Sequence, residues 1–196
     1  SSNTALTDLY CFNNELTSLD VSANTALTRL DCYSNQLTSL DVSNNTLLSI
    51  LWVGNNSLNS LDVSTNTALT NLRCNDNELT SLDVSNNTAL TQLVCGDNQI
   101  TSLDLSSNTA LTELNCHDNQ FTYLNMKNGV TDQLNVFVVT DNSLTCIEVN
   151  ADDVAYATAN WVSTGQYPNI DAGVTFSESC AVDGNPDYTY VPDNNF

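Results

Sequence analysis

The residues of this chain that could carry out chemistry are one histidine, seven cysteines and 23 acidic residues. Because His117 is the single histidine, any device that pairs a nucleophile with an imidazole base must be centred on it. The repeat described below places no nucleophile beside it, and Asp118 is expected to be its neighbour only along the chain. We therefore predict that the protein is not an enzyme, and we assign no catalytic residue and no cofactor.

The cysteines fall into two groups by their spacing. Five of them share one position of a repeated pattern: Cys11, Cys32, Cys74, Cys95 and Cys116. Valine holds the same position in two further copies, at Val53 and Val139, so the position suits a small apolar side chain. Side chains in register on neighbouring strands keep their Cβ atoms farther apart than a disulfide requires. We predict that these five cysteines are reduced and buried. The alternative, a metal site, would need ligands that this position lacks, since no histidine or carboxylate shares it.

The spacing of these cysteines comes from a repeat of 21 residues, LxxLxCxxNxLTSLDVSxNTA. The first leucine of each unit falls at Leu6, Leu27, Leu48, Leu69, Leu90, Leu111 and, after two extra residues, Leu134. One unit cannot bury its own leucines, whereas stacked units bury a continuous row of them. The LxC segment fits a short strand with two inward side chains. The asparagine at position 9 of every unit is expected to bond the backbone of adjacent turns.

This pattern resembles the leucine-rich repeat, and more narrowly the short 21-residue bacterial class called IRREKO, which occurs in secreted or surface proteins of Bacteroidetes-like bacteria. The resemblance covers about residues 3–150. It implies a leucine-rich repeat solenoid, a right-handed coil with a parallel β-sheet on its concave face. The LTSLDVS half of the unit is too short for an ordinary helix and rich in Thr, Ser and Val, so we expect short extended or turn segments on the convex face.

After the last unit the repeat gives way to a segment that resembles the closing segment of the same bacterial family. Asn160–Trp161 and Ile170–Cys180 match its N-W and I-D-A-G-V-x-F-x-x-x-C patterns. It supplies three apolar candidates to cover the last coil: Trp161, Val174 and Phe176. The resemblance implies a disulfide between Cys146 and Cys180 that staples this cap, and such a bond implies an oxidising, extracellular environment.

The expected organisation has three parts. Residues 3–150 form the solenoid, residues 151–184 form the C-terminal cap, and residues 185–196 are a linker or the start of a following module. The sequence contains no run of about 18 apolar residues that could span a membrane, and its first residues do not form a signal peptide. The array opens inside a unit, at Asn3-Thr4-Ala5, and the final VPDNNF resembles the opening of a new module in related bacterial proteins. We therefore interpret the chain as a fragment of a larger modular protein that is secreted or displayed on a bacterial cell surface.

The chain is strongly acidic, with three Lys and Arg, 23 Asp and Glu, and a formal net charge of −20. This balance argues against binding to nucleic acid or to an anionic membrane, both of which need clustered cations. Part of the charge forms one row of the repeat: Asp20, Asp41, Asp62, Asp83 and Asp104. Carboxylates stacked at a strand spacing of about 5 Å repel each other unless they are bonded or screened. We expect hydrogen bonds from nearby Ser and Thr rather than calcium.

The outward-facing strand positions do not repeat, although stacking alone would favour small polar residues there. On neighbouring strands they carry aromatic, arginine and other side chains that we predict form one ligand-binding patch on the concave sheet: Tyr10, Phe12, Arg29, Asp31, Tyr33, Ile50, Trp52 and Arg73. Side chains at equivalent positions of adjacent strands lie about 5 Å apart and touch. Exposed aromatic and arginine residues are typical of interfaces.

The sequence therefore predicts a non-catalytic binding or adhesion module that recognises a protein partner through its concave sheet. A glycan on the same face is the first alternative, because aromatic rings stack on sugars. A structural spacer is the second, since exposed aromatic residues also stabilise sheets or could pack on an upstream unit. A more distant alternative is ice binding by a row of threonines: Thr17, Thr38, Thr80, Thr101 and Thr122.

Overall fold

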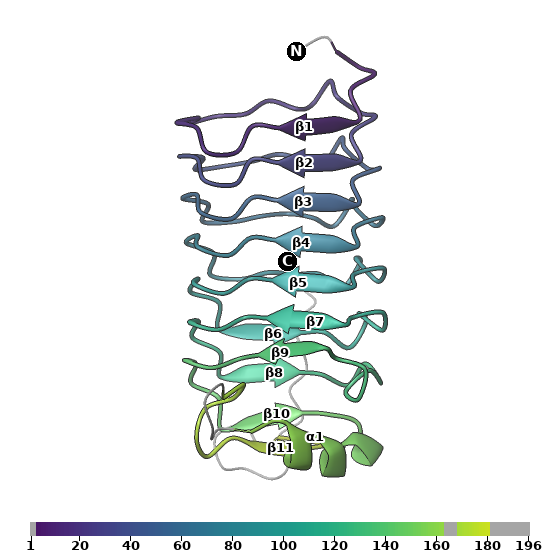
Figure 1. The fold of residues 1–196 in the computed structure, drawn as a ribbon, viewed down its shortest axis with the longest axis vertical. Helices are drawn as coiled ribbons and strands as arrows, with labels where there is room; N and C mark the ends of the chain where they lie inside the picture. Colours follow the sequence, from purple (N-terminus) through teal and green to yellow (C-terminus); the bar gives the residue numbers. More distant parts are fainter. Residues whose placement is uncertain (1–2, 163–167, 181–196) are drawn as a thin grey trace, which may run out of the picture.

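The computed structural model describes residues 3–162 and 168–180, which form a stack of coils (Figure 1). Each coil contributes a three-residue strand to one parallel, seven-stranded sheet, called here the long sheet. In spatial order its strands are β1 (Asp8–Tyr10), β2 (Arg29–Asp31), β3 (Ile50–Trp52), β4 (Asn71–Arg73), β5 (Gln92–Val94), β7 (Glu113–Asn115) and β9 (Val136–Val138). Leu9 pairs with Leu30 and Leu30 with Leu51, so equivalent positions of the repeat stack in register. The predicted parallel β-solenoid is confirmed.

A second, four-stranded parallel sheet forms in the last coils, and its order is β11-β10-β8-β6. Its strands are β6 (Ser102–Asp104), β8 (Tyr123–Asn125), β10 (Cys146–Glu148) and β11 (Thr175–Ser177). The first three lie in the half of the coil that corresponds to LTSLDVS, and the arrows of β8 and β10 point opposite to those of the long sheet (Figure 1). In the earlier coils the same half has turn or irregular backbone, as expected.

The core consists of rows of identical side chains. The leucines that open the inner coils, such as Leu27 and Leu48, have no exposed surface, those of the first and last coils are half-buried, and the cysteine row continues this packing. Four of the five repeat cysteines are buried and Cys11, in the first coil, is half-buried; all five are free thiols. Burial raises the pKa of the Cys32 thiol to about 12. The prediction of free thiols is confirmed for all five cysteines, and that of burial for four of them.

Two rows of asparagine tie each coil to the one before it. At position 9, the Asn56 side chain donates to the carbonyl oxygens of Val53, in its own coil, and Cys32, in the preceding coil, at 3.0 and 3.2 Å. A second row is fully buried, and there Asn66 donates to the carbonyl oxygens of Val42 and Asn45 at 3.0 and 2.9 Å. The position 9 bonds satisfy carbonyls that have no backbone donor, whereas the carbonyls of Val42 and Asn45 also accept from the backbone N–H groups of Asn45 and Leu48. The predicted structural role of the position 9 asparagine is confirmed.

The end of the stack is covered by a short 3₁₀ helix, η1 (Ala151–Asp153), by α1 (Val154–Asn160) and by β11. The Trp161 ring stacks on Phe137 of the last long-sheet strand at 3.8 Å, and Phe176 meets Trp161 edge-on at 5.5 Å. Val174 packs against the core, so all three predicted covering residues are in place.

The predicted disulfide between Cys146 and Cys180 is present. The expected linker or following module at residues 185–196, and the last part of the expected cap, lie outside the described residues. Within the ranges 3–162 and 168–180, no helix is long and apolar enough to cross a membrane.

Candidate binding site

The predicted ligand-binding residues converge on one hollow over strands β1 to β5 of the long sheet. The hollow has a volume of about 590 Å³, and its lining comprises Tyr10, Phe12, Arg29, Asp31, Tyr33, Trp52, Arg73, Asn75 and Val94. Seven of the eight predicted residues are therefore brought together. Ile50 is half-buried on β3 but does not line the hollow, and the sequence analysis did not select Asn75 and Val94.

Four of the lining residues form an alternating stack of aromatic rings and guanidinium groups. Tyr10, Arg29, Trp52 and Arg73 come from β1, β2, β3 and β4, which are consecutive in the sheet. The Arg29 guanidinium carbon lies 5.0 Å from the centre of the Tyr10 ring and 4.4 Å from that of Trp52, and the Arg73 carbon lies 4.8 Å from Trp52. Each of these distances is within the range of a cation–π interaction. The stack orders long side chains that would otherwise be mobile on a sheet surface.

A chain of amide side chains holds Trp52 and Arg73 in place. The Trp52 indole N–H donates to Asn71 Oδ1 at 2.8 Å, and the Asn71 amide donates in turn to Gln92. Gln92 Oε1 also accepts from Nε and Nη2 of Arg73 at 3.3 and 3.2 Å, while its own amide donates to Glu113. Outward-facing residues of β4, β5 and β7 therefore orient a stack that lies over β1 to β4.

Asp31 is more deeply buried than its strand position predicted, and Gly54, next to the hollow, makes room for one of the lining rings. Asp31 is 5% exposed, whereas its outward-facing strand position predicted an exposed side chain; it lies in the wall of the hollow and accepts a bond from the Tyr33 backbone N–H at 3.3 Å. Gly54 leaves room for the Tyr33 ring, because a Cβ there would come within 2.9 Å of Tyr33 Cε2 and 2.8 Å of Asn75 Oδ1. Gly54 thus helps to shape the hollow although it carries no side chain.

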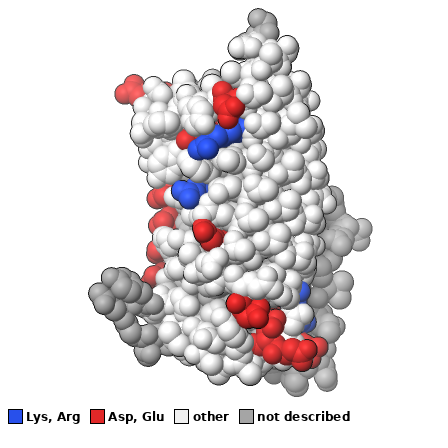
Figure 2. Space-filling view, turned by 45° about the vertical axis from the view of Figure 1, so that its right-hand side comes forward, with Lys and Arg blue, Asp and Glu red and all other residues white. Residues whose placement is uncertain are grey.

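The charge of the hollow contrasts with that of the chain. Among the described residues, neither Arg29 nor Arg73 has a carboxylate within 4.0 Å, whereas Lys127 lies 3.6 Å from Glu148. Figure 2 shows few cationic atoms on the face that it presents, and acidic atoms in a row along one edge of that face. The two arginines therefore provide local positive charge on an acidic molecule.

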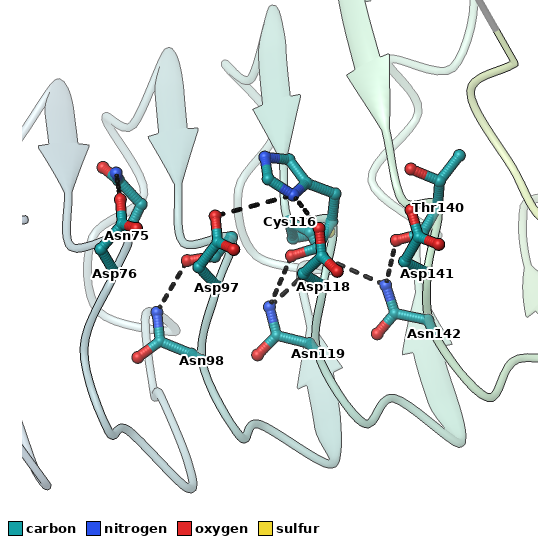
Figure 3. A network of polar contacts seen from close by, with 12 residues as sticks. Asn75, Asp76, Asp97, Asn98, Cys116, Asp118, Asn119, Thr140, Asp141 and Asn142 are labelled. Carbon is teal, nitrogen blue, oxygen red and sulfur yellow. Dashed lines mark hydrogen bonds and ion pairs between the residues drawn. The ribbon is translucent and has the colours of Figure 1, made fainter.

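A second cluster of polar groups lies in the loops that follow the long-sheet strands (Figure 3). His117 Nδ1 lies 2.8 Å from Asp118 Oδ2 and 3.8 Å from Asp97 Oδ2. The expectation that Asp118 is a neighbour only along the chain is therefore wrong. Burial, followed by the charges of Asp76 and Asp118, raises the pKa of Asp97, while His117 opposes this shift.

Stacking brings Asp97 and His117 together although they are 20 residues apart in the sequence, and the sequence analysis missed this contact. One ligand atom from each of Asp97, His117 and Asp118 lies within 4.8 Å of the other two. Nitrogen and carboxylate oxygen are donors that a divalent transition metal accepts. The signal that could have found the cluster is position 8 of the repeat, where Asp76, Asp97, Asp118 and Asp141 follow each other.

The acidic row in the LTSLDVS half has local partners, as expected. In each of its five coils a serine backbone N–H donates to the aspartate two residues earlier, as from Ser43 to Asp41 Oδ1 at 2.9 Å. Hydrogen bonds from the serine side chain and then from its backbone N–H lower the pKa of Asp20, Asp41 and Asp62. The row is therefore stabilised within each coil.

Comparisons with known proteins place the fold. No protein-family model and no curated protein matches the chain. Among solved structures, the functional domain of InlJ from Listeria monocytogenes is 43% identical with a TM-score of 0.69, over 75% of this chain and 35% of that one. The internalin InlF of the same organism is 27% identical with a TM-score of 0.66, over 72% of this chain and 44% of that one. A leucine-rich repeat protein of Leptospira interrogans is 25% identical with a TM-score of 0.63, over 72% of this chain and 38% of that one.

The chain thus spans less than half the length of each of these three structures. The InlJ structure is described as including a cysteine ladder, and five cysteines share one repeat position in this chain. The seven-stranded parallel sheet, the stacked leucine rows and the similarity to these bacterial structures agree. The chain is a leucine-rich repeat protein.

Proposed function

We propose that this chain is a non-catalytic binding module that recognises a protein partner through the hollow over strands β1 to β5. One observation carries the proposal: outward-facing aromatic and arginine side chains from successive coils converge on a single hollow of about 590 Å³. Tyr10 and Phe12 at its rim are 53% and 46% exposed. Exposed aromatic surface next to arginine is typical of the centre of a protein interface.

The repeat itself supplies a comparison within the chain. Positions needed for stacking keep the same residue type from coil to coil. Asn66 donates to the carbonyls of Val42 and Asn45, and Asn87, 21 residues later, donates to those of Val63 and Asn66. The outward-facing strand positions vary, and they are the positions that line the hollow. Similarity to internalin structures fits a protein-interaction or adhesion module.

The proposed setting is the outside of a bacterial cell. The Cys146–Cys180 bond supports a secreted or surface-displayed protein, because disulfides form and persist in oxidising compartments. The 21-residue unit supports assignment to the short IRREKO type found in Bacteroidetes-like bacteria. The absence of enzymatic activity belongs to the same proposal.

A peptide display library tests the proposed binding surface. We expect selection on the wild-type chain to yield peptides that lose binding to the double variant Trp52→Ala, Arg73→Glu, because the variant removes one ring of the stack and inverts one charge. Tyr156→Ala is the matched control, since Tyr156 is an exposed aromatic residue of α1 outside the hollow. Circular dichroism and urea unfolding establish that each variant is folded. Peptides that bind the double variant as tightly as the wild type would refute the proposal.

The structure also bears on the glycan alternative. A sugar stacks on the open face of an aromatic ring, yet an arginine from each neighbouring strand lies within 5 Å of the centre of the Trp52 ring. This arrangement favours a protein partner over a glycan at Trp52, and leaves Tyr10 and Phe12 as the open rings. Titration of neutral oligosaccharides separates the two when the tryptophan emission of the wild type is compared with that of Trp52→Phe, which keeps Trp161 outside the hollow. A saturable change that is lost in the variant would assign a sugar to Trp52.

A further inference from the structure

The two arginines of the hollow lack the partner that the third cation has. Lys127 lies 3.6 Å from the Glu148 carboxylate, whereas Arg29 and Arg73 have no carboxylate within 4.0 Å in the described part of the chain. The chain carries 23 acidic residues, so a carboxylate partner for an arginine could readily have been provided. These two charges have no carboxylate partner and lie in a hollow that is also lined by Tyr10, Phe12, Tyr33 and Trp52.

The stack restricts how an anion can reach the guanidinium groups. Strand β2 lies between β1 and β3, so the rings of Tyr10 and Trp52 flank the Arg29 guanidinium from both sides. Arg29 Nε is buried and has no hydrogen-bond partner among the described residues, while Arg73 uses Nε and Nη2 for Gln92. The edge formed by the two terminal nitrogens remains for a ligand. Two parallel N–H donors on such an edge match the two oxygens of a carboxylate.

The surrounding charge selects among anions. The net charge of −20 repels a polyanion, and this repulsion extends over a screening length of about 8 Å at physiological ionic strength. An isolated carboxylate approaches the two arginines closely without carrying further negative charge over the surface. Asp31, the single carboxylate in the lining, already accepts a bond from Tyr33.

The rest of the lining indicates what accompanies the carboxylate. Tyr10 and Phe12 are the most exposed large apolar side chains of the site, and Val94 adds a further apolar surface. Asn75 is the single neutral amide in the lining. This composition suits aromatic or aliphatic groups better than the many hydroxyl groups of a sugar.

We infer that the hollow takes an aspartate or glutamate side chain of the protein partner, carried beside an aromatic or aliphatic residue. The carboxylate binds the terminal nitrogens of Arg29 or Arg73, and the apolar neighbour packs on Tyr10 and Phe12. This inference rests on the binding role proposed above, and it adds the chemical class of the group that is recognised.

Nuclear magnetic resonance tests this directly, because Arg29 and Arg73 are the only arginines in the sequence and give the only two arginine Nε–H signals. The probes are the blocked dipeptides acetyl-Glu-Phe-amide and acetyl-Gln-Phe-amide. We expect the glutamate peptide to shift the arginine signals saturably, and the glutamine peptide to bind about tenfold more weakly or less, since a charge-assisted bond is lost. Arg29→Lys with Arg73→Lys should abolish this preference while keeping the charge. Lys127→Gln is the control and should retain it.

Two results would overturn the inference: equal affinity for the two dipeptides, or tighter binding of glucuronate than of the glutamate peptide, which would assign the carboxylate to an acidic sugar. The display selection separates this failure from failure of the proposed function. Selected peptides that need Trp52 but tolerate replacement of every acidic residue would leave the binding surface intact and refute the carboxylate. Selected peptides that ignore Trp52 would refute the binding surface itself.

Discussion

The guanidinium carbon of Arg29 lies 4.4 Å from the centre of the Trp52 ring, although the two residues come from different strands and different repeat positions. A cation–π contact at a partly exposed site contributes about 0.5–1 kcal/mol. We expect a double-mutant cycle with Arg29→Met and Trp52→Leu to give a coupling energy of this size in urea unfolding. A control cycle that pairs Arg29→Met with Tyr156→Leu should show no coupling. Equal coupling in both cycles would contradict a direct interaction.

Gly54→Ala should perturb both the hollow and the stability of the chain. The new Cβ would lie 2.9 Å from the Asn75 carbonyl oxygen, as well as against the Tyr33 ring, and a backbone atom cannot move away as easily as a side chain can. Overpacking of this kind costs about 1–3 kcal/mol. Urea unfolding measures the cost, and the chemical shifts of Tyr33 report the displaced ring. Gly96→Ala is the comparison and should cost less, because its closest contact, to His117, is 3.1 Å.

Asn66→Ala should lower the free energy of unfolding by about 2 kcal/mol. Asn66 has no exposed surface, and its removal breaks two buried hydrogen bonds to the preceding coil, leaving the carbonyl oxygens of Val42 and Asn45 with their backbone donors alone. Asn59→Ala is the matched control, since Asn59 is exposed and bonds only the neighbouring Ser60 side chain. Equal destabilisation by the two substitutions would show that the buried row does not tie the coils together.

The cysteine row predicts a loss of stability at alkaline pH. Burial raises the pKa of Cys32 from 9.0 to about 12, so the folded chain keeps a neutral thiol at a pH where the unfolded chain ionises it. The resulting stabilisation is complete below pH 9 and is lost as the pH rises from 9 toward 12, by at most about 1.4 kcal/mol per pH unit for one thiol.

Cys32→Val tests the alkaline loss, because valine occupies the same repeat position at Val53 and Val139 and is buried there. We expect the urea midpoint of the variant to fall less steeply than that of the wild type above pH 9. Parallel curves for the two proteins would refute the assignment to this thiol.

Removal of the Cys146–Cys180 bond should loosen the end of the stack selectively. The two cysteines are 34 residues apart in the sequence, and a disulfide that closes a loop of this size stabilises a domain by about 3 kcal/mol. In the variant Cys146→Ser, Cys180→Ser, hydrogen exchange should become faster in α1 and β11, while the coils of β2 to β5 keep their protection because each contacts only its neighbours. Uniform acceleration along the whole stack would contradict a local role.

The repeat made much of the fold predictable. A fixed step of 21 residues places Leu30, Leu51 and Leu72 on adjacent strands, and that register is observed. The helix α1 and the strands of the second sheet were not predicted, because they form where the repeat has ended or where only some coils pair by hydrogen bonds. Local sequence does not reveal which coils will do so.

The residues of the candidate site were predictable by position but not by conformation. The strand position placed Trp52 and Asp31 on the outward face, yet it did not reveal that Trp52 leans toward Asn71 or that Asp31 is covered by its neighbours. Long side chains choose among several rotamers, and tertiary contacts decide the choice. The contact between His117 and Asp97 was not predicted, because it depends on how the loops after β5 and β7 stack and not on the strand pattern.

The asparagine rows have a consequence for how such an array can change its length. Each Asn66-type amide bonds carbonyls of the preceding coil alone, so a duplicated or deleted block of 21 residues recreates the same junction on both sides. The Tyr10 to Arg73 stack has no such tolerance, since it depends on four particular coils standing in one order. Growth of the array beyond β7 therefore leaves the stack and its amide chain unchanged, whereas a coil inserted between β2 and β3 would separate Arg29 from Trp52 and remove the candidate site.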